Sequence, residues 1–143
     1  MLYKNQLTIA LVLVLICVGA KMWNDHYINS IHSHININDI ETIKISGIAV
    51  ENQYKLATKD EIKNIVNWFN STSHIHSNPD FKGTTGDSSI IITLKSKKEI
   101  AIIRSGEDFE IQRYNKKGKW ISYWGEQGEI KRVLEDSAKI NNE

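Results

Sequence analysis

The sequence has 143 residues, enough for one ordinary domain, and no Pro-rich or Gly/Ser-rich linker divides it. It carries 18 basic and 17 acidic residues, and 16 of each remain without Lys4, Lys21 and Asp25 beside the N-terminal apolar segment. This neutral balance argues against nucleic acid as a partner, because such binders need surplus positive charge to offset phosphate repulsion. The single cysteine, Cys17, excludes an intrachain disulfide, a Cys-based metal site and a redox pair.

Residues 1–23 are predicted to form a membrane anchor or signal segment. Leu7 to Ala20 is continuously apolar but spans only about 21 Å as a helix, less than the roughly 30 Å hydrocarbon core of a bilayer. Aromatic residues flank it like interfacial anchors, so a transmembrane helix from Tyr3 to Trp23 reaches about 31 Å. The competing interpretation is a cleaved secretory signal, because the small residues from Val18 to Ala20 follow a basic start and an apolar centre.

The flanking charges predict which side of the membrane holds the domain. Lys4 and the N-terminal amine favour a cytoplasmic N-terminus, which Lys21 partly offsets. We therefore expect a single-pass protein of the cell membrane with its domain on the extracytoplasmic side, the alternative being secretion after signal cleavage. A lipoprotein signal would place the modified Cys after a small residue, whereas Ile16 precedes Cys17, so lipid attachment is not expected.

Residues 24–39 are predicted as a polar juxtamembrane linker. They include His32 and His34, which a strand would place on one face, where two neutral imidazoles can share a transition-metal ion. A second pair, His74 and His76, lies in the loop expected after the first helix of the domain. Because no third ligand has a diagnostic spacing, we predict solvated histidines, no bound metal and no other cofactor.

Residues 40–143 are the predicted domain, which begins with a β-hairpin and a helix. Ile40 to Ile48 alternates between apolar and polar residues, and Tyr54 to Leu56 follows as its hairpin partner. Thr58 to Glu61 has the form of a capping box, in which the Thr hydroxyl meets a free backbone N–H and the Glu reaches back to the cap. The helix that it opens has one apolar stripe, formed by Ile62, Ile65, Val66 and Phe69.

A longer break, Ser71 to Gly86, is predicted as a loop of the kind that often carries function. From Asp87 to Trp124, apolar residues then recur at every second position, the period of a strand with one buried face. Three short polar turns divide this stretch into a four-strand antiparallel meander, and Glu129 to Lys139 resumes a helical pattern. The predicted fold class is α+β: a hairpin and a helix, the meander, and a C-terminal helix, all behind an N-terminal transmembrane helix.

The first and third turns of a meander fall at the same end of the sheet. These turns carry Lys95, Lys97, Lys98, Lys116, Lys117 and Lys119. The second and fourth turns, at the other end, carry Glu107, Asp108, Glu126 and Glu129. We predict a charge-polarised sheet whose lysines meet anionic lipid headgroups or an acidic wall polymer, each contributing up to about 1 kcal/mol.

A second candidate surface is the sheet face opposite the helices. The residues that alternate with the expected core set are Ile91, Ala101, Ile103, Trp120 and Trp124. Exposed aromatic and aliphatic clusters mark partner surfaces, so Ile91, Ile103, Trp120 and Trp124 are the residues predicted to bind a protein partner at the cell surface. A partner of this kind would suit an immunity or inhibitor protein.

The sequence contains no nucleophile elbow, phosphate loop, Gly-x-Gly-x-x-Gly or His-Glu-x-x-His, so we expect that the protein is not an enzyme. The apolar N-terminus, the strand Glu41 to Ile45, the Thr58 to Phe69 helix and the Ile-rich meander closed by a helix resemble small extracytoplasmic domains of Gram-positive bacteria typified by YhfM-like lipoproteins. This resemblance covers roughly residues 40–140 and implies a location and a fold. The predicted function is a non-catalytic, membrane-anchored binding module, with a metal-binding domain using the two His pairs or an immunity protein as alternatives.

Overall fold

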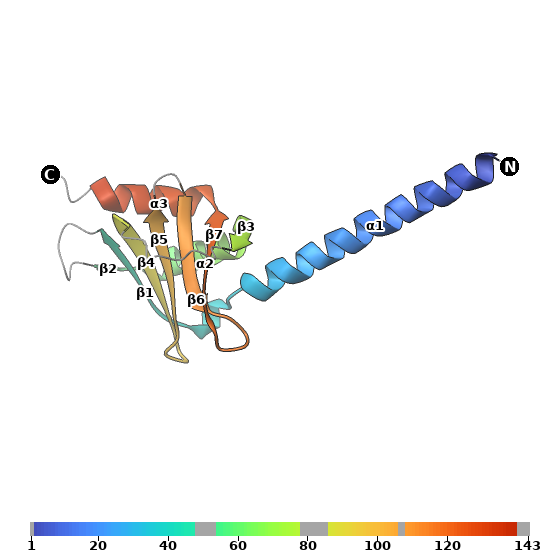
Figure 1. Cartoon of the computed structure of the whole chain (residues 1–143). Helices are drawn as coiled ribbons and strands as arrows, with labels where there is room; N and C mark the ends of the chain where they lie inside the picture. The colour runs from blue at the N-terminus through green and yellow to red at the C-terminus, as the bar shows by residue number, and fades with distance from the viewer. Residues whose placement is uncertain (1, 48–53, 78–85, 106–107, 140–143) are drawn as a thin grey trace. The chain divides into compact units, whose positions relative to one another are not determined.

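The computed structural model describes residues 2–47, 54–77, 86–105 and 108–139, in two units, Met1–Ser30 and Ile31–Glu143. The helix α1 (Leu2–Ile31) supplies the first unit (Figure 1). Its described part contains one segment, Ile9–Ile28, that is long and apolar enough to cross a membrane. The predicted N-terminal apolar helix is therefore confirmed, and its insertion into a membrane stays a prediction.

The second unit is an α+β domain with one antiparallel sheet of seven strands. The strands are β1 (Ile40–Gly47), β2 (Lys55–Leu56), β3 (Ser73–Ser77), β4 (Ser88–Leu94), β5 (Glu99–Ser105), β6 (Asp108–Tyr114) and β7 (Trp120–Glu126). Their order in the sheet is β2-β1-β4-β5-β6-β7-β3. The predicted meander is confirmed as β4 to β7, and β1 pairs with β2 as predicted.

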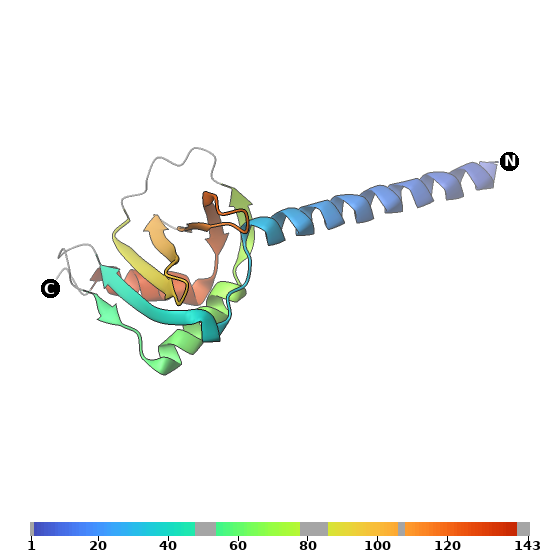
Figure 2. The ribbon, with the colours of Figure 1, turned by 90° about the horizontal axis from the view of Figure 1, so that it is seen from below.

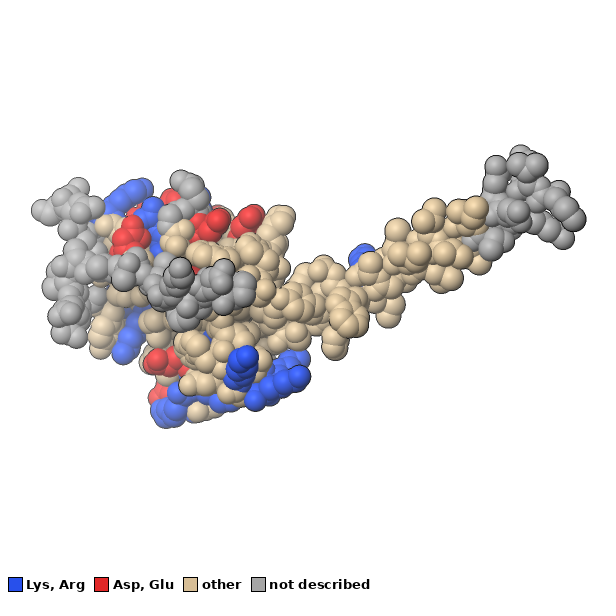
Figure 3. Space-filling model, in the orientation of Figure 1, with Lys and Arg blue, Asp and Glu red and all other residues tan. Residues whose placement is uncertain are grey.

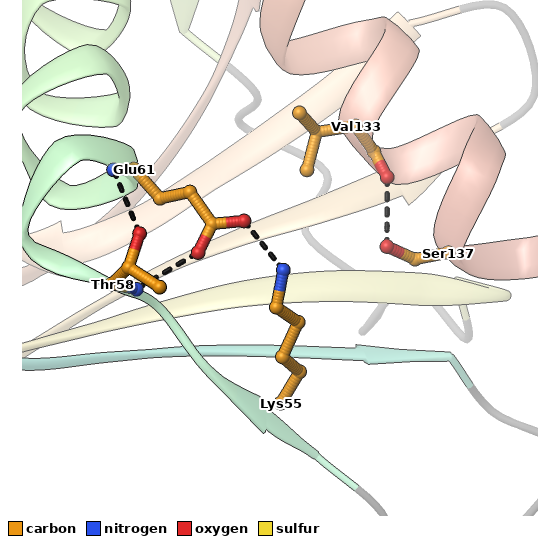
Figure 4. A network of polar contacts seen from close by, with 5 residues as sticks. All are labelled: Lys55, Thr58, Glu61, Val133 and Ser137. Atoms are coloured by element: carbon orange, nitrogen blue, oxygen red, sulfur yellow. Dashed lines mark hydrogen bonds and ion pairs between the residues drawn. The ribbon is translucent and has the colours of Figure 1, made fainter.

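Two helices complete the domain, α2 (Lys59–Asn70) and α3 (Gly128–Lys139), with a short 3-10 turn, η1 (Ile37–Asp39), before β1. The capping box of α2 is present: the Glu61 backbone N–H donates to the Thr58 hydroxyl, and the Thr58 N–H donates to the Glu61 carboxylate (Figure 4). Lys55 also bonds this carboxylate, and hydrogen bonds from Lys55 and Thr58 lower the pKa of Glu61. A charged carboxylate is favourable at a helix N-terminus, so the box stabilises the start of α2.

The register of the sheet explains how both helices share one core. Opposite residues in an antiparallel pair lie on the same face, and Ile102 faces both Ile90 and Ile111, which in turn faces Tyr123. The buried residues of the helices join this same cluster: Ile65, Val66, Phe69, Ile130 and Leu134. Both helices therefore cover one face of the sheet, and the alternating residues lie on the other.

The predicted loop from Ser71 to Gly86 is wrong in its first part, which forms the edge strand β3. This strand pairs with β7, at the opposite edge of the sheet from β2 (Figure 2). Its sequence, Ser-His-Ile-His-Ser, has a single apolar residue, so it resembles a loop until β7 offers a hydrogen-bonding edge. Residues 78–85 lie outside the described part of the chain.

The predicted polar linker over residues 24–39 is also wrong for its second part. Helix α1 continues to Ile31, and the residues that follow belong to the folded unit. His32 and Ile35 are buried, and the backbone of Ile35 exchanges two hydrogen bonds of 2.9 Å with the side-chain amide of Asn70 on α2. The segment is polar in composition but is docked, because its polar groups have partners inside the domain.

Candidate functional site

The six predicted lysines gather at one end of the domain, which we call the lysine end. Lys95, Lys97 and Lys98 lie in the turn between β4 and β5, and Lys116, Lys117 and Lys119 lie in the turn between β6 and β7. Both turns are at the same end of the sheet in Figure 1, where basic side chains gather in Figure 3. All six side chains are exposed.

Backbone and side-chain hydrogen bonds shape these two turns. In the first turn Lys97 adopts a left-handed conformation, with φ of 64°, and its N–H donates to the Leu94 carbonyl. In the second turn the Asn115 side-chain oxygen accepts from the N–H groups of Lys117 and Lys119, at 2.9 and 3.0 Å. Gly118 supplies the positive φ that this turn requires. The lysines therefore project from ordered turns rather than from long loops.

Most of these lysines have no acidic partner in the part of the chain that the structure describes. The Lys97 Nζ binds the Glu41 carboxylate at 2.6 Å, and the other five lysines form no ion pair with any described residue. Asp39 and Glu99 are the further carboxylates near these turns, and both are exposed. The lysine end thus keeps a net positive charge, although the whole chain is close to neutral.

The opposite end is less acidic than the sequence pattern predicts. Glu126 lies 3.0 Å from the Nδ1 atom of His74, and Glu129 lies 2.5 Å from an Arg132 nitrogen. Asp108 is exposed, and Glu107 falls outside the described residues. Arg132 on α3 brings positive charge to this end, and His74 on β3 contacts Glu126, neither of which the turn sequences alone reveal.

A cleft of about 260 Å³ opens between the two lysine-bearing turns. Its charged lining residues are Lys98, Glu99, Arg113 and Lys116, and its polar and aromatic lining includes Ser33, Ser96, Tyr114 and Asn115. Ser33 comes from the docked segment after α1, whereas the others come from β4 to β6 and their turns. The cleft therefore joins the lysine end to the place where the chain enters the domain.

Arg113 is the buried member of this cleft. It is 8% exposed, and its Nη1 donates to the Ser33 carbonyl at 2.7 Å. The guanidinium carbon also lies 5.7 Å from the centre of the Phe69 ring, within cation–π range. Its Nε is buried with no hydrogen-bond partner, and no described carboxylate pairs with it. Sequence reasoning missed Arg113, because in a strand it follows the same alternation as the apolar core residues.

His32 sits at the centre of the polar contacts that hold the docked segment. Its Nε2 lies 2.9 Å from the Phe69 carbonyl, and its Nδ1 lies 2.9 Å from the Tyr123 hydroxyl. A carbonyl can only accept, so Nε2 carries the hydrogen and Nδ1 accepts from the Tyr123 O–H. Burial, together with the positive charge of Arg113, lowers the pKa of His32 to about 4.

These contacts bear on the hypothesis that the His pairs bind metal. Both ring nitrogens of His32 are engaged, so this imidazole has no free lone pair for a metal ion. His34, His74 and His76 are exposed. Within the described residues, no group of three or more His, Cys, Asp or Glu side chains is placed to hold a metal ion. No geometry on the described surface therefore favours this alternative.

The predicted sheet-face residues do share the face opposite the helices. Ile91 pairs with Ala101, and Glu110 pairs with both Ile103 and Trp124. These apolar side chains are half-buried, whereas Trp120 is 40% exposed. The Trp120 ring contacts that of Tyr114 at 4.9 Å, at the base of the second lysine turn. Trp120 therefore belongs to the lysine end as much as to the sheet face, and partner binding by this face stays a prediction.

The fold and the site define a class in broad terms: an α+β domain with a cationic end, behind an apolar N-terminal helix. Comparison of the chain with protein-family models, with curated proteins and with solved structures finds no match.

Proposed function

We propose that this chain is a non-catalytic, membrane-anchored binding module whose lysine end contacts the anionic surface of its own membrane, on the extracytoplasmic side. The observation that carries this proposal is the set of five exposed lysines that pair with no described carboxylate, at the end where the chain enters the domain. Each lysine near an anionic bilayer contributes up to about 1 kcal/mol.

The short tether supports the choice of a membrane as the partner. Five residues lead from Ile28, where the candidate span ends, to Ser33 in the cleft lining. Even fully extended, they cover at most about 18 Å. Electrostatic attraction decays over about 8 Å at physiological ionic strength, so the anchor would hold the lysine end within a few such lengths of the headgroups.

The aromatic pair at the second turn supports the same orientation. Tyr114 and Trp120 are 44% and 40% exposed and flank the turn that carries three lysines. Tyr and Trp combine an apolar ring with a polar group, which suits the boundary between headgroups and acyl chains. Lysine and aromatic side chains at one tip therefore favour a lipid surface over a purely polar partner.

The test is vesicle cosedimentation of residues 31–143, compared with a variant carrying Gln at the six lysine-end positions. A control of equal charge change replaces Lys44, Lys55, Lys59, Lys63, Lys131 and Lys139, and circular dichroism checks that each protein folds. We expect the lysine-end variant to lose at least tenfold of its binding to anionic vesicles, and the control to keep most of it. Equal losses, or no loss in either variant, would contradict the proposal.

The sidedness has its own test in intact cells. A C-terminal tag that external protease removes, on a chain of full-length mass, supports an anchored domain outside the cytoplasm. A protected tag contradicts this sidedness. A chain that begins near Lys21 and is released to the medium would instead support the secreted alternative.

A further inference from the structure

We propose that the cleft between the two lysine turns is a binding site for a phosphate group, with Arg113 as its buried ligand and Lys98 and Lys116 as its exposed ones. The inference rests on the proposed function, because it assigns a specific ligand to the same lysine end. A defined site of this kind differs from the diffuse attraction between a cationic surface and a membrane.

Arg113 is buried and has hydrogen-bond donors that no described residue uses, which favours a ligand at this position. A buried charge is costly unless it is paired and hydrogen-bonded, and Arg113 is 8% exposed without a described carboxylate partner. A guanidinium has five N–H donors, whereas the one acceptor found for it among the described residues is the Ser33 carbonyl. The arginine is therefore fixed in place by neutral groups and retains donors for an anion.

The contacts of Arg113 also preorganise it. The Ser33 carbonyl accepts a hydrogen bond from its Nη1, and the guanidinium lies against the Phe69 ring. These two contacts hold the guanidinium against α2 and the segment that follows α1 before any ligand arrives. A preorganised fork loses less entropy on binding, and guanidinium groups match the geometry of phosphate oxygens.

Charge and size favour phosphate as the chemical class. The lining holds three positive groups, Arg113, Lys98 and Lys116, against one negative group, Glu99, so the net charge is about +2. A phosphate monoester carries about −1.5 to −2 near neutral pH, and a lipid phosphodiester carries −1. The volume of about 260 Å³ lies below the usual 300–1,000 Å³ of pockets for larger organic ligands. Such a cleft suits one phosphate group whose attached chain remains outside.

The same chemistry has two sources, the headgroup of an anionic phospholipid and a soluble phosphate. The experiment uses the full chain in maltoside micelles, which contain no phosphate. Inorganic phosphate and phosphatidylglycerol are added in separate titrations, at constant ionic strength. The chain has three arginines, so the ¹H–¹⁵N signal of the Arg113 Nε–H can be assigned by its loss in an Arg113→Lys variant.

We expect a saturable shift of the Arg113 signal, with the Arg104 and Arg132 signals unchanged. Saturation by inorganic phosphate supports a soluble ligand, and saturation by phosphatidylglycerol alone supports a lipid headgroup. The Lys98→Gln/Lys116→Gln variant should bind about tenfold more weakly or worse, because two charge-assisted hydrogen bonds are lost.

The matched control is Lys95→Gln/Lys117→Gln, which removes the same charge from the same two turns but leaves the cleft lining intact. We expect its affinity to remain within about twofold of the unmodified chain. A chain that shows no saturable shift with either probe overturns the phosphate site, and so does equal weakening in both double variants. Either result leaves the membrane proposal standing if the six-lysine variant still loses vesicle binding, so the two proposals can fail separately.

Discussion

The two ends of the meander use their charged side chains in different ways. At the end near the start of α3, Arg104 pairs with Asp87, His74 with Glu126 and Arg132 with Glu129. At the lysine end, one lysine of six has a carboxylate partner among the described residues. The chain is almost neutral overall, so this difference arises from placement and not from composition.

This difference indicates that an anionic partner would bind at the lysine end and not at the paired end. Exposed ion pairs contribute about 0–1 kcal/mol each, and at this end two arginines offset the charge of the carboxylates that they contact. Unpaired lysines repel one another and create a positive potential that attracts anions. At the lysine end, such lysines project from ordered turns beside the buried Arg113. This arrangement suits the binding of an anion.

The largest predicted effect is a loss of stability at low pH, caused by the buried His32 in the segment that docks beside the lysine end. The pKa of His32 is lowered to about 4, from about 6.5 in an unfolded chain. Between these values the unfolded state binds a proton that the native state does not. The stabilisation is therefore complete above about pH 6.5 and is lost as the pH falls towards 4, by about 3 kcal/mol. Chemical denaturation at a series of pH values measures it.

The matched variants for this prediction are His32→Gln and His34→Gln, since His34 is an exposed neighbour. The difference in free energy of unfolding between the unmodified domain and His32→Gln should shrink as the pH falls from 7 to 4. His34→Gln should follow the unmodified domain closely, because His34 is the smallest of the causes that lower the pKa of His32. A His32→Gln variant with unaltered pH dependence would show that His32 is not buried in its neutral form.

The second predicted effect is a loss of stability at the opposite end of the sheet, when Gly125 at the end of β7 is replaced by alanine. A Cβ at this position would lie 2.5 Å from the Thr72 Cγ2 and 3.2 Å from the Ile75 Cδ1, so β3 and the residue before it must move. We expect Gly125→Ala to reduce the free energy of unfolding by about 1–3 kcal/mol, with vesicle binding at the lysine end retained. Gly128→Ala is the control, because open space surrounds that glycine. Equal stability of the two variants would contradict the packing of β3.

A third, smaller effect concerns the order of the second lysine turn. Asn115→Ala removes the acceptor for the Lys117 and Lys119 N–H groups, which should cost about 1 kcal/mol of unfolding free energy. We also expect weaker vesicle binding at unchanged net charge, because the lysines of this turn become less well placed. Unchanged binding together with lower stability would indicate that turn geometry does not matter for the contact.

The smallest predicted effect concerns an ion pair at the end opposite the lysines. Arg104→Gln removes the ion pair with Asp87, whose carboxylate is 55% exposed, and should cost less than about 1 kcal/mol. Vesicle binding should not change, although the charge change equals that of any single lysine substitution. A loss of binding as large as that of Lys98→Gln would show that net charge, and not the lysine end, governs the interaction.

Much of the fold could be predicted from local sequence patterns. The alternation of Ile90, Ile92, Ile100 and Ile102 defines strands with one buried face, and short polar turns leave an antiparallel meander as the simple connection. Thr58 and Glu61 define the start of α2 to the residue, because a capping box depends on neighbouring residues only. These features are local, so the sequence contains the information that specifies them.

The rest depends on contacts between distant residues. His32 lies 91 residues from Tyr123, and Arg113 lies 80 residues from Ser33, so no local pattern indicates that these polar groups satisfy one another. For the same reason β3 is recognisable only once β7 is present beside it. The lysine turns could be placed at one end from topology alone, whereas the cleft and its buried arginine required the three-dimensional structure.

The measurement that tests the central claim most directly is the distance of each end of the domain from a bilayer. The full chain with Cys17→Ser accepts a nitroxide label at Ser96→Cys, in the first lysine turn, or at Asp136→Cys on α3; both positions are exposed. In anionic nanodiscs with a paramagnetic metal chelated at the headgroups, we predict strong relaxation of the label at position 96 and weak relaxation at 136, with the contrast reduced by high salt. Equal relaxation at both positions, or stronger relaxation at 136, would contradict the account.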